Sequence, residues 1–403
     1  MEGSSSQIKS RALYCTLLEN PAMIRSPLPI RWPHVRLQVP AILLAFSLGL
    51  AVTSVYGQIN TGIVILNQEE QARFRDLLDD HAEVKALYDS IRARADTHLS
   101  LPANPIPVIY YEGLLDTDPD RVASVESLLD INRLIDMLYA GYGSDPEYYA
   151  PKIKEIVLAW ARTYLPDGNT INEHKLTPLF WAYYLLRDAY SRGERSEVES
   201  WMYDIALQEM GRVRTPNNNW QSKRMKIVGL IGGILENATM RDFVLLGIKD
   251  YIGSSYFPDG TSVDLRHRDA LSYHVSGIEP LLDIFINFRV FSDDFDLYGY
   301  TSPSGSSVEK AIAYVMPFVK GEKVHEEWVN TQVQLDKERA AAGLEKYQPG
   351  TLFQPEQAMP MLRWAIYYHP GYMPMVCPGQ PDGACHIEAV LNGPVVRGRQ
   401  QDP

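Results

Sequence analysis

The sequence lacks the features that mark several large protein classes. It has three cysteines in 403 residues, and no group of ligand-type side chains has the spacing of a metal site. No glycine-rich nucleotide-binding motif is present, and no alternating apolar–polar series predicts a sheet. The one long apolar run, residues 39–51, is too short for a comfortable membrane span. We therefore expect no metal, no obligatory cofactor and no β-sheet fold.

Residues 1–57 have the pattern of a signal peptide with an upstream extension. Arg31 and Arg36 precede the apolar run, and a Val-Tyr-Gly triplet ending at Gly57 offers small residues at its outer positions. This pattern predicts cleavage after Gly57 and a periplasmic or secreted protein, with no stable membrane insertion afterwards. Met23 is an alternative start, and an uncleaved membrane anchor is the alternative to export.

The predicted mature domain, residues 58–403, is acidic. Removing residues 1–57 takes away five Lys/Arg and two Asp/Glu, which leaves 33 basic against 48 acidic residues and a formal charge of −15. This charge and the lack of a basic arm argue against a nucleic-acid partner. A polyanionic substrate would also be repelled globally, so its binding needs cations gathered locally in a cleft.

Only two cysteines, Cys377 and Cys385, remain in this domain. The seven residues between them are rich in Pro and Gly, so an exported protein is expected to join them in a disulfide that closes a small loop. Two free thiols are the alternative.

The mature chain has a helical pattern almost throughout. Asn67 and Glu70 form a capping-box signature, and Pro, Gly, Asp and Asn clusters separate the segments that follow. Apolar residues at helical spacing cover roughly 122–140, 147–164, 172–192, 196–212, 222–237, 239–252, 270–290, 307–319 and 357–368. This rhythm predicts one all-α domain, a bundle, solenoid or toroid of stacked helical hairpins. Residues 325–350 are expected to form a polar surface helix and loop.

The first candidate for chemistry is the stretch from Asn217 to Lys223. Three successive asparagines precede Trp220, and a basic pair begins at Lys223. Amides, an indole and basic groups together can hold a sugar ring and its carboxylate. The alternative is a turn and helix cap formed by Asn218 and Asn219.

The second candidate runs from Gly168 to Leu176 and contains the sequence Asn-Glu-His-Lys-Leu. It leads into an aromatic stretch that begins at Phe180. Helix capping by Asn172 and a buried aromatic face explain most of this segment without a function.

The third candidate lies between Asp259-Gly260 and His274. Arg266 stands seven residues before Tyr273, two turns away if the segment between them is helical, so both side chains could face one cleft. A guanidinium beside a phenol can hold a carboxylate and move a proton next to it. The alternative is a surface Arg-His-Arg sequence paired with neighbouring aspartates, with Tyr273 in the core.

Together these three segments resemble the alginate lyase family, in its branch of helical-toroid polysaccharide lyases that includes polysaccharide lyase family 5. The specific parts are the tandem Asn and the Arg266/Tyr273 spacing, and the resemblance extends from about Leu66 to Tyr372. It implies an incomplete (α/α) toroid with a tunnel-like cleft.

The resemblance also implies β-elimination on a 1,4-linked polyuronide, most of all polymannuronate in alginate. Asn218 or Asn219 and Arg266 would stabilise the charge that develops on the substrate carboxylate. Tyr273 would transfer the proton, as base and then as acid. Asn217, Trp220, Lys223 and His274 complete the site as substrate-binding candidates.

The chain departs from the family in one position. Typical family 5 enzymes follow the tandem Asn with a His, whereas Asn219 or Trp220 stands there in this sequence. Lys223 or His274 could supply the missing positive charge. The departure makes a related polyuronide, such as glucuronan, an alternative substrate.

Two other classes of function stay open. A glycoside hydrolase of toroid fold would use two carboxylates across a cleft, from Asp259, Asp264, Asp269 and Glu173. A non-catalytic protein that binds acidic polysaccharides is the other alternative.

Overall fold

The computed structural model describes residues 59–212 and 215–399, so the predicted signal peptide and its cleavage site lie outside the described residues. Within these ranges the regular secondary structure is helical, except for one antiparallel pair of two-residue strands, β1 (Glu326–Glu327) and β2 (Thr351–Leu352). The all-α prediction is therefore confirmed. No helix in the described part of the chain combines the length and apolarity needed to span a membrane.

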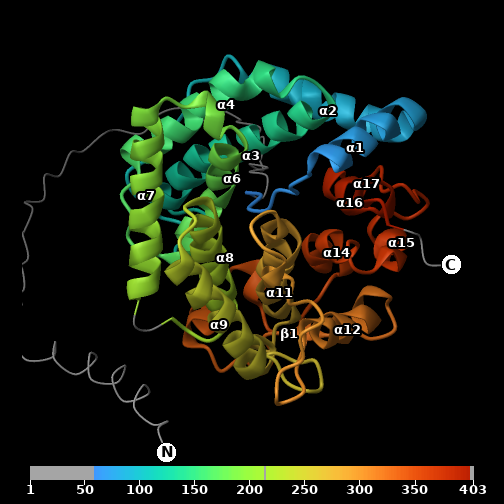
Figure 1. Ribbon diagram of the computed structural model, residues 1–403. Coiled ribbons are helices and arrows are strands. Elements are labelled where there is room, and N and C mark those ends of the chain that lie inside the picture. The colour runs from blue at the N-terminus through green and yellow to red at the C-terminus, as the bar shows by residue number, and fades with distance from the viewer. Residues whose placement is uncertain (1–58, 213–214, 400–403) are drawn as a thin grey trace, which may run out of the picture. The chain divides into compact units, whose positions relative to one another are not determined.

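Most of the helices follow one another with short connections, whereas residues 99–118 form a long connection between α2 and α3 (Figure 1). The α-helices are α1 (Gln68–Asp80), α2 (Ala82–His98), α3 (Pro119–Gly143), α4 (Pro146–Thr163), α5 (Thr170–Glu173), α6 (Thr177–Leu185), α7 (Arg192–Gly211), α8 (Asn219–Ile234), α9 (Ala238–Ser255), α10 (Val263–Arg268), α11 (Leu271–Asn287), α12 (Val308–Val319), α13 (Gln334–Ala341), α14 (Met359–Ala365), α15 (Met373–Val376), α16 (Ile387–Asn392) and α17 (Pro394–Arg397). The 3₁₀ helices are η1 (His174–Leu176), η2 (Arg187–Ala189), η3 (Phe288–Val290), η4 (Asp293–Phe295), η5 (Glu345–Tyr347), η6 (Pro355–Ala358) and η7 (Pro370–Tyr372).

The described helices form an inner and an outer layer around a common centre. In the inner layer α3, α6, α8, α11, α14 and α16 each pack against the next, while α2, α4, α7, α9 and α12 pack outside them. All residues of α8 from Arg224 to Ile234 are buried, as expected for a helix that is enclosed on every side. This arrangement is the predicted incomplete (α/α) toroid (Figure 1).

The first described residues, 59–66, occupy the centre of this ring. They form no helix, and Ile63 and Ile65 are almost completely buried. The side chain of Asn287 on α11 donates to the carbonyl of Ile63 (2.7 Å) and accepts from the amide of Ile65 (3.0 Å). An extended segment can be buried in this way because side chains replace the backbone hydrogen bonds that a helix or sheet would give it.

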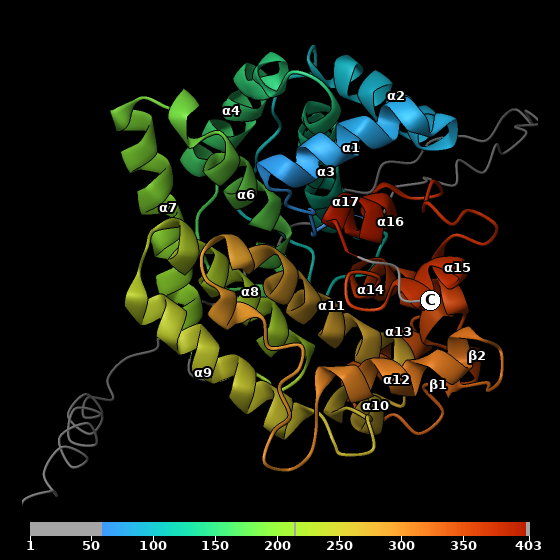
Figure 2. The ribbon, with the colours of Figure 1, turned by 45° about the vertical axis from the view of Figure 1, so that its right-hand side comes forward.

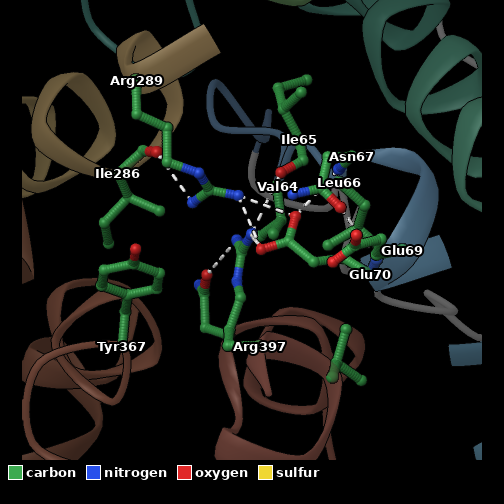
Figure 3. Close-up of polar contacts among 12 residues, drawn as sticks. Val64, Ile65, Leu66, Asn67, Glu69, Glu70, Ile286, Arg289, Tyr367 and Arg397 are labelled. Atoms are coloured by element: carbon green, nitrogen blue, oxygen red, sulfur yellow. Dashed lines mark hydrogen bonds and ion pairs between the residues drawn. The ribbon is translucent and has the colours of Figure 1, made fainter. Parts of the chain in front are cut away.

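A buried ion cluster joins the first described helix to the last one (Figure 3). Glu70 of α1 is 5% exposed. Its carboxylate forms ion pairs with Nη2 of Arg289 at 2.7 Å and with Nη1 of Arg397 in α17 at 3.0 Å. The same carboxylate accepts from the amide of Asn67 at 2.8 Å, which completes the predicted capping box. The ring of Tyr367 lies beneath both guanidinium groups. One carboxylate thus pairs with two guanidinium groups where the ends of the ring meet, the buried Arg397 and the partly exposed Arg289.

Cys377 and Cys385 form a disulfide, as the sequence predicts for an exported chain. Cys377 is buried and packs with Ile366, Met373 and Ala389 in a small apolar cluster. The disulfide therefore ties the turn-rich loop before α16 to the rest of the domain.

The predicted helix over residues 172–192 is divided into four short helices, α5, η1, α6 and η2. Pro178 stands in the first turn of α6, and a proline has no amide hydrogen to continue a preceding helix. The side chain of Asn169 caps α5. The resulting 3₁₀ turn contains His174 and Lys175, which both belong to the candidate site.

Candidate active site

Tyr273 lies in the first turn of α11, and a second segment of the chain holds this helix end in place. The N-terminal residue before α11 provides no side-chain cap. Glu327 of β1 takes that role, because its carboxylate accepts from the amide and the hydroxyl of Ser272 at 2.7 and 3.1 Å. A carboxylate at this end of a helix satisfies free amides and complements the helix dipole.

The segment anchored by Glu327 brings two polar groups to the hydroxyl of Tyr273. Nη1 of Arg339 donates to this hydroxyl at 3.3 Å, and the hydroxyl of Tyr347 lies 3.4 Å from it. The guanidinium of Arg268 lies over the phenol ring, 4.2 Å from its centroid. The indole of Trp328 packs edge-on against the same ring. The half-buried phenol therefore has a guanidinium at its oxygen and another at its face.

Tyr347 is held as a neutral phenol. Burial, together with the neighbouring phenol of Tyr273, raises the pKa of Tyr347 above its ordinary value. Tyr347 can therefore donate a hydrogen bond to the Tyr273 oxygen but does not compete with it as a base.

Arg266 does not lie beside Tyr273, and this corrects the expected geometry. The helix α10 ends at Arg268, and Asp269 adopts a left-handed conformation (φ 52°) before α11 begins. Arg266 is exposed, stacks on the ring of Phe257, and pairs with Asp259 at 2.8 Å. Because one continuous helix is absent, a spacing of seven residues does not bring the two side chains to one face.

The three successive asparagines have three different environments. Asn217 is exposed and bonded to Ser254 and Ser255, and Asn218 caps α8. Asn219 is 5% exposed and its Oδ1 has no hydrogen-bond partner among the described residues. Its backbone also lies close to α11, at Gly277. Asn219 is therefore the asparagine whose side-chain oxygen is unpaired among the described residues, beside the helix that carries Tyr273.

Lys223 lies on the next turn of α8 and also faces α11. Its Nζ donates to the carbonyl and the hydroxyl of Ser276, at 3.1 and 3.0 Å. Ser276 follows Tyr273 by three residues, so it lies one turn further along the same helix face. Burial lowers the pKa of Lys223 to about 8, although the negative charges of Glu279 and Asp264 oppose this effect.

Further cationic groups surround Lys223. Burial lowers the pKa of Lys175 to about 8, and burial with the nearby lysines holds the pKa of His174 well below its ordinary value. Lys226 of α8 is 1% exposed. The three lysines bring ammonium groups together within an acidic domain, as binding of a polyanion requires, whereas His174 is neutral at such a lowered pKa.

His274 and Trp220 do not join this cluster through the contacts that the structure gives them. His274 is 1% exposed, its Nε2 lies 2.9 Å from the carbonyl of Ala311, and burial lowers its pKa to about 4. It is a neutral core residue between α11 and α12, which corrects its assignment as a substrate-binding group. Trp220 is half-buried beside Arg212, which lies over its ring.

The carboxylates considered for a glycoside hydrolase do not form a facing pair. Asp259 pairs with Arg266, and Asp269 accepts from Asn330. Asp264 is buried and accepts from the amide of Asn219 at 2.8 Å. Glu173 is buried and accepts from backbone amides of its own turn. Each of the four has a structural partner, which removes the support for the hydrolase alternative.

Sequence reasoning missed the residues that come from the segment between β1 and β2. Arg339, Tyr347 and Trp328 all lie in residues 325–350, which the sequence suggests to be a polar surface helix and loop. In the structure this segment packs beside α10 and α12 (Figure 2). The aromatic residues within a stretch of charged ones were the only local sign, because Arg339 reaches Tyr273 through a contact that spans 66 residues.

No group of His, Cys, Asp and Glu in residues 59–212 and 215–399 has the geometry of a metal site.

Comparison with known proteins agrees with this fold. A family model described as alginate lyase matches residues 79–325. An alginate lyase from Bacteroides ovatus superposes with a TM-score of 0.56 at 18% identity, over 81% of this chain and 98% of its own. A histidine-to-alanine variant of alginate lyase A1-III, solved with a tetrasaccharide, gives a TM-score of 0.42 at 19% identity over 59% and 76% of the two chains. Among curated proteins we found no significant match.

Proposed function

Because the family model matches more than half of the chain, the chain belongs to the alginate lyase family and is a polysaccharide lyase, and on this premise we propose its substrate, its mechanism and its location. The substrate is a 1,4-linked polyuronide, first of all the polymannuronate of alginate. The reaction is β-elimination, which leaves a 4,5-unsaturated uronate end. The predicted signal peptide, cleaved after Gly57, would carry the enzyme to the periplasm or out of the cell.

The observation that carries this mechanism is the environment of the Tyr273 oxygen, with Arg339 at 3.3 Å. A guanidinium at this distance holds the Tyr273 oxygen as an anion, and this phenolate takes the C5 proton of the sugar and becomes the neutral phenol. The C4–C5 double bond then forms as the C4–O bond breaks, and the proton passes from Tyr273 to the leaving glycosidic oxygen. In mannuronate both groups lie on the same face, so one phenol serves both steps.

The C5 proton is acidic enough to leave only if the adjacent carboxylate is neutralised. Asn219 and Lys223 lie on α8 and face the helix that carries Tyr273. We assign them this role, with the amide of Asn219 as hydrogen-bond donor and the ammonium of Lys223 as the counter-charge. Lys223 thus takes the place of the histidine that follows the tandem Asn in family 5 enzymes.

The direct test of the function is ultraviolet absorbance of the unsaturated product during incubation with polymannuronate, polyguluronate and glucuronan. We expect absorbance to rise fastest with polymannuronate. A faster rise with glucuronan would move the substrate to that polymer while keeping the mechanism. Reducing ends without absorbance would indicate hydrolysis, and binding without either signal would indicate a non-catalytic protein.

Arg339 and Arg266 provide a matched pair of variants. Arg339→Gln is expected to lower kcat on the order of 10- to 100-fold, since it removes a charge-assisted hydrogen bond of roughly 1.5–3 kcal/mol. Arg266→Gln is expected to leave kcat within about twofold, because Arg266 forms an exposed pair with Asp259. Steady-state kinetics on polymannuronate distinguish the two. A larger loss of kcat in Arg266→Gln than in Arg339→Gln would identify Arg266, and not Arg339, as the catalytic cation.

The activity should decline at alkaline pH through Lys223. Its pKa of about 8 means that the ammonium is present below that pH and is lost as the pH rises through it. For the wild type, kcat/KM is therefore expected to fall above pH ~8, roughly tenfold per pH unit once the lysine is neutral. A guanidinium stays charged, so Lys223→Arg should shift this decline upward, whatever its absolute rate. If the decline at alkaline pH stayed at the same pH in Lys223→Arg, deprotonation of Lys223 could not be its cause.

A further inference from the structure

Three buried or half-buried lysines lie near the candidate active site, and two of them form hydrogen bonds or ion pairs with other residues. Lys226 pairs with Asp283 at 2.6 Å and donates to the carbonyl of Thr61 at 2.7 Å, so it anchors the segment in the centre of the ring. Lys223 donates to Ser276. Lys175 is 8% exposed, yet its Nζ has no hydrogen bond or ion pair among the described residues.

The contact that the structure gives the Nζ of Lys175 is the ring of Tyr111, 3.8 Å from its centroid. The guanidinium of Arg121 lies 4.0 Å from the centroid of the same ring and pairs with Asp116. One tyrosine ring therefore meets two cations, and only one of them has a carboxylate. A ring face offsets part of the cost of burying an ammonium, but less than a counter-ion does.

The charges around Lys175 do not supply its missing partner. Burial and the positive charge of Arg121 lower its pKa, while Glu279 and Glu112 act in the opposite direction without pairing with it. Glu112 instead lies 4.0 Å from Arg339, the residue that contacts Tyr273. Glu112 therefore acts on both Lys175 and the arginine beside Tyr273, so Lys175 lies near the candidate active site. Its ammonium has no anionic partner among the described residues and can bind one.

The local fold holds Lys175 in a fixed position. The carboxylate of Glu173 accepts from the amides of Asp167 and Gly168, at 2.9 and 3.1 Å. The amide of Asn172 donates to the carbonyl of Ile109 at 2.6 Å, which joins this turn to the loop that carries Tyr111. A lysine that is buried without a partner and held on a rigid turn is preorganised for a ligand.

We propose that Lys175 is the centre of a second anion subsite, which binds the carboxylate of the uronate next to the one that Tyr273 deprotonates. The ring of Tyr111 forms its apolar side. This subsite rests on the proposed function, since it takes its ligand from the same polymer chain. It makes the substrate a run of consecutive uronates, and it disfavours polymers in which uronates alternate with neutral sugars.

The test is Lys175→Met, which keeps the length of the side chain and removes its charge. We expect KM for polymannuronate to rise on the order of tenfold or more, with kcat changed by less than about threefold, since the lost contact is the same in the ground and transition states. The melting temperature should rise, because a buried charge without a partner is replaced by an apolar group. A lower melting temperature with an unchanged KM would make Lys175 structural and overturn the proposal.

Two further variants keep the result interpretable. Lys175→Arg restores a cation and should recover most of the affinity. Lys249→Met removes the same charge from an exposed lysine of α9 that also lies over a tyrosine ring, Tyr300 at 5.8 Å, and should leave KM unchanged. If KM rose equally in Lys249→Met, the loss of any one positive charge would explain the rise in Lys175→Met, and this would count against the subsite.

Binding measured without turnover separates this proposal from the proposed function. In a Tyr273→Phe background, calorimetry with a mannuronate tetramer should show at least tenfold weaker binding after Lys175→Met. A uronate–neutral sugar alternating tetramer should bind weakly to both proteins and show little difference between them. Equal binding of the mannuronate tetramer to both proteins would refute the subsite even if lyase activity is found. Weaker binding would support it even if Tyr273 proves not to be the base.

Discussion

Replacing Tyr273 with phenylalanine is expected to lower kcat for unsaturated-product formation on the order of 10³-fold, the largest kinetic effect among these predictions. The variant loses the oxygen that both takes the C5 proton and returns it to the leaving group. It keeps the ring that packs against Trp328 and beneath Arg268, so the fold should be preserved. Ultraviolet assays with concentrated enzyme, with circular dichroism as a check on folding, measure the two properties separately.

Tyr347→Phe is the matched control for this variant. It removes a hydroxyl 3.4 Å from the Tyr273 oxygen but leaves the proposed proton-transfer group in place. We expect a loss of less than about tenfold, as for a single neutral hydrogen bond of roughly 0.5–1.5 kcal/mol. If Tyr273→Phe retained the full rate, or if Tyr347→Phe were the more damaging change, the assignment of Tyr273 would be wrong.

The largest expected effect on stability comes from Glu70→Gln. The glutamine keeps an oxygen that can accept from the amide of Asn67, but it leaves Arg289 and Arg397 without their shared counter-charge (Figure 3). Burial already lowers the pKa of Arg397 to about 10 even with Glu70 present. Breaking a buried pair by removing one partner costs about 3–5 kcal/mol, so we expect a loss of that size in the free energy of unfolding by urea.

Glu69→Gln is the control, because Glu69 precedes Glu70 in the same helix turn and its side chain is 86% exposed. Its surface pair with Arg73 should contribute less than about 1 kcal/mol. Similar losses in both variants would mean that helix α1 responds to any change of charge, and that the buried cluster has no special part in stability.

The sequence was sufficient for the fold because helical periodicity and caps are local properties. The capping box at Asn67 and Glu70 and most of the helices appear where the apolar pattern predicts them. What the pattern could not predict is the role of residues 59–66, which form no helix and are buried through side chains as distant as Asn287. Backbone hydrogen bonds to side chains hundreds of residues away leave no periodic signal.

The candidate site was predicted in part, and the limits have a physical cause. Tyr273, Asn219 and Lys223 were all candidates, because the turn and helix signals around them are local. The sequence spacing predicts Arg266 next to Tyr273 only if one continuous helix joins them, and the left-handed residue Asp269 interrupts that helix. A non-glycine residue at positive φ is uncommon, and here Asp269 accepts from the backbone and side chain of Asn330. That contact, like the one between Arg339 and Tyr273, exists only in the folded chain.

The ion cluster around Glu70 also bears on the order in which the ring is assembled. Arg397 donates to the carbonyl of Ile65 across 332 residues of sequence, among the longest separations in the molecule. Loop-closure entropy must be overcome before such a contact contributes, so we expect it to form late in folding. An interaction formed after the transition state changes the unfolding rate and leaves the folding rate almost untouched. We therefore expect the cluster to slow the unfolding of the completed ring, with little effect on the rate at which the ring folds.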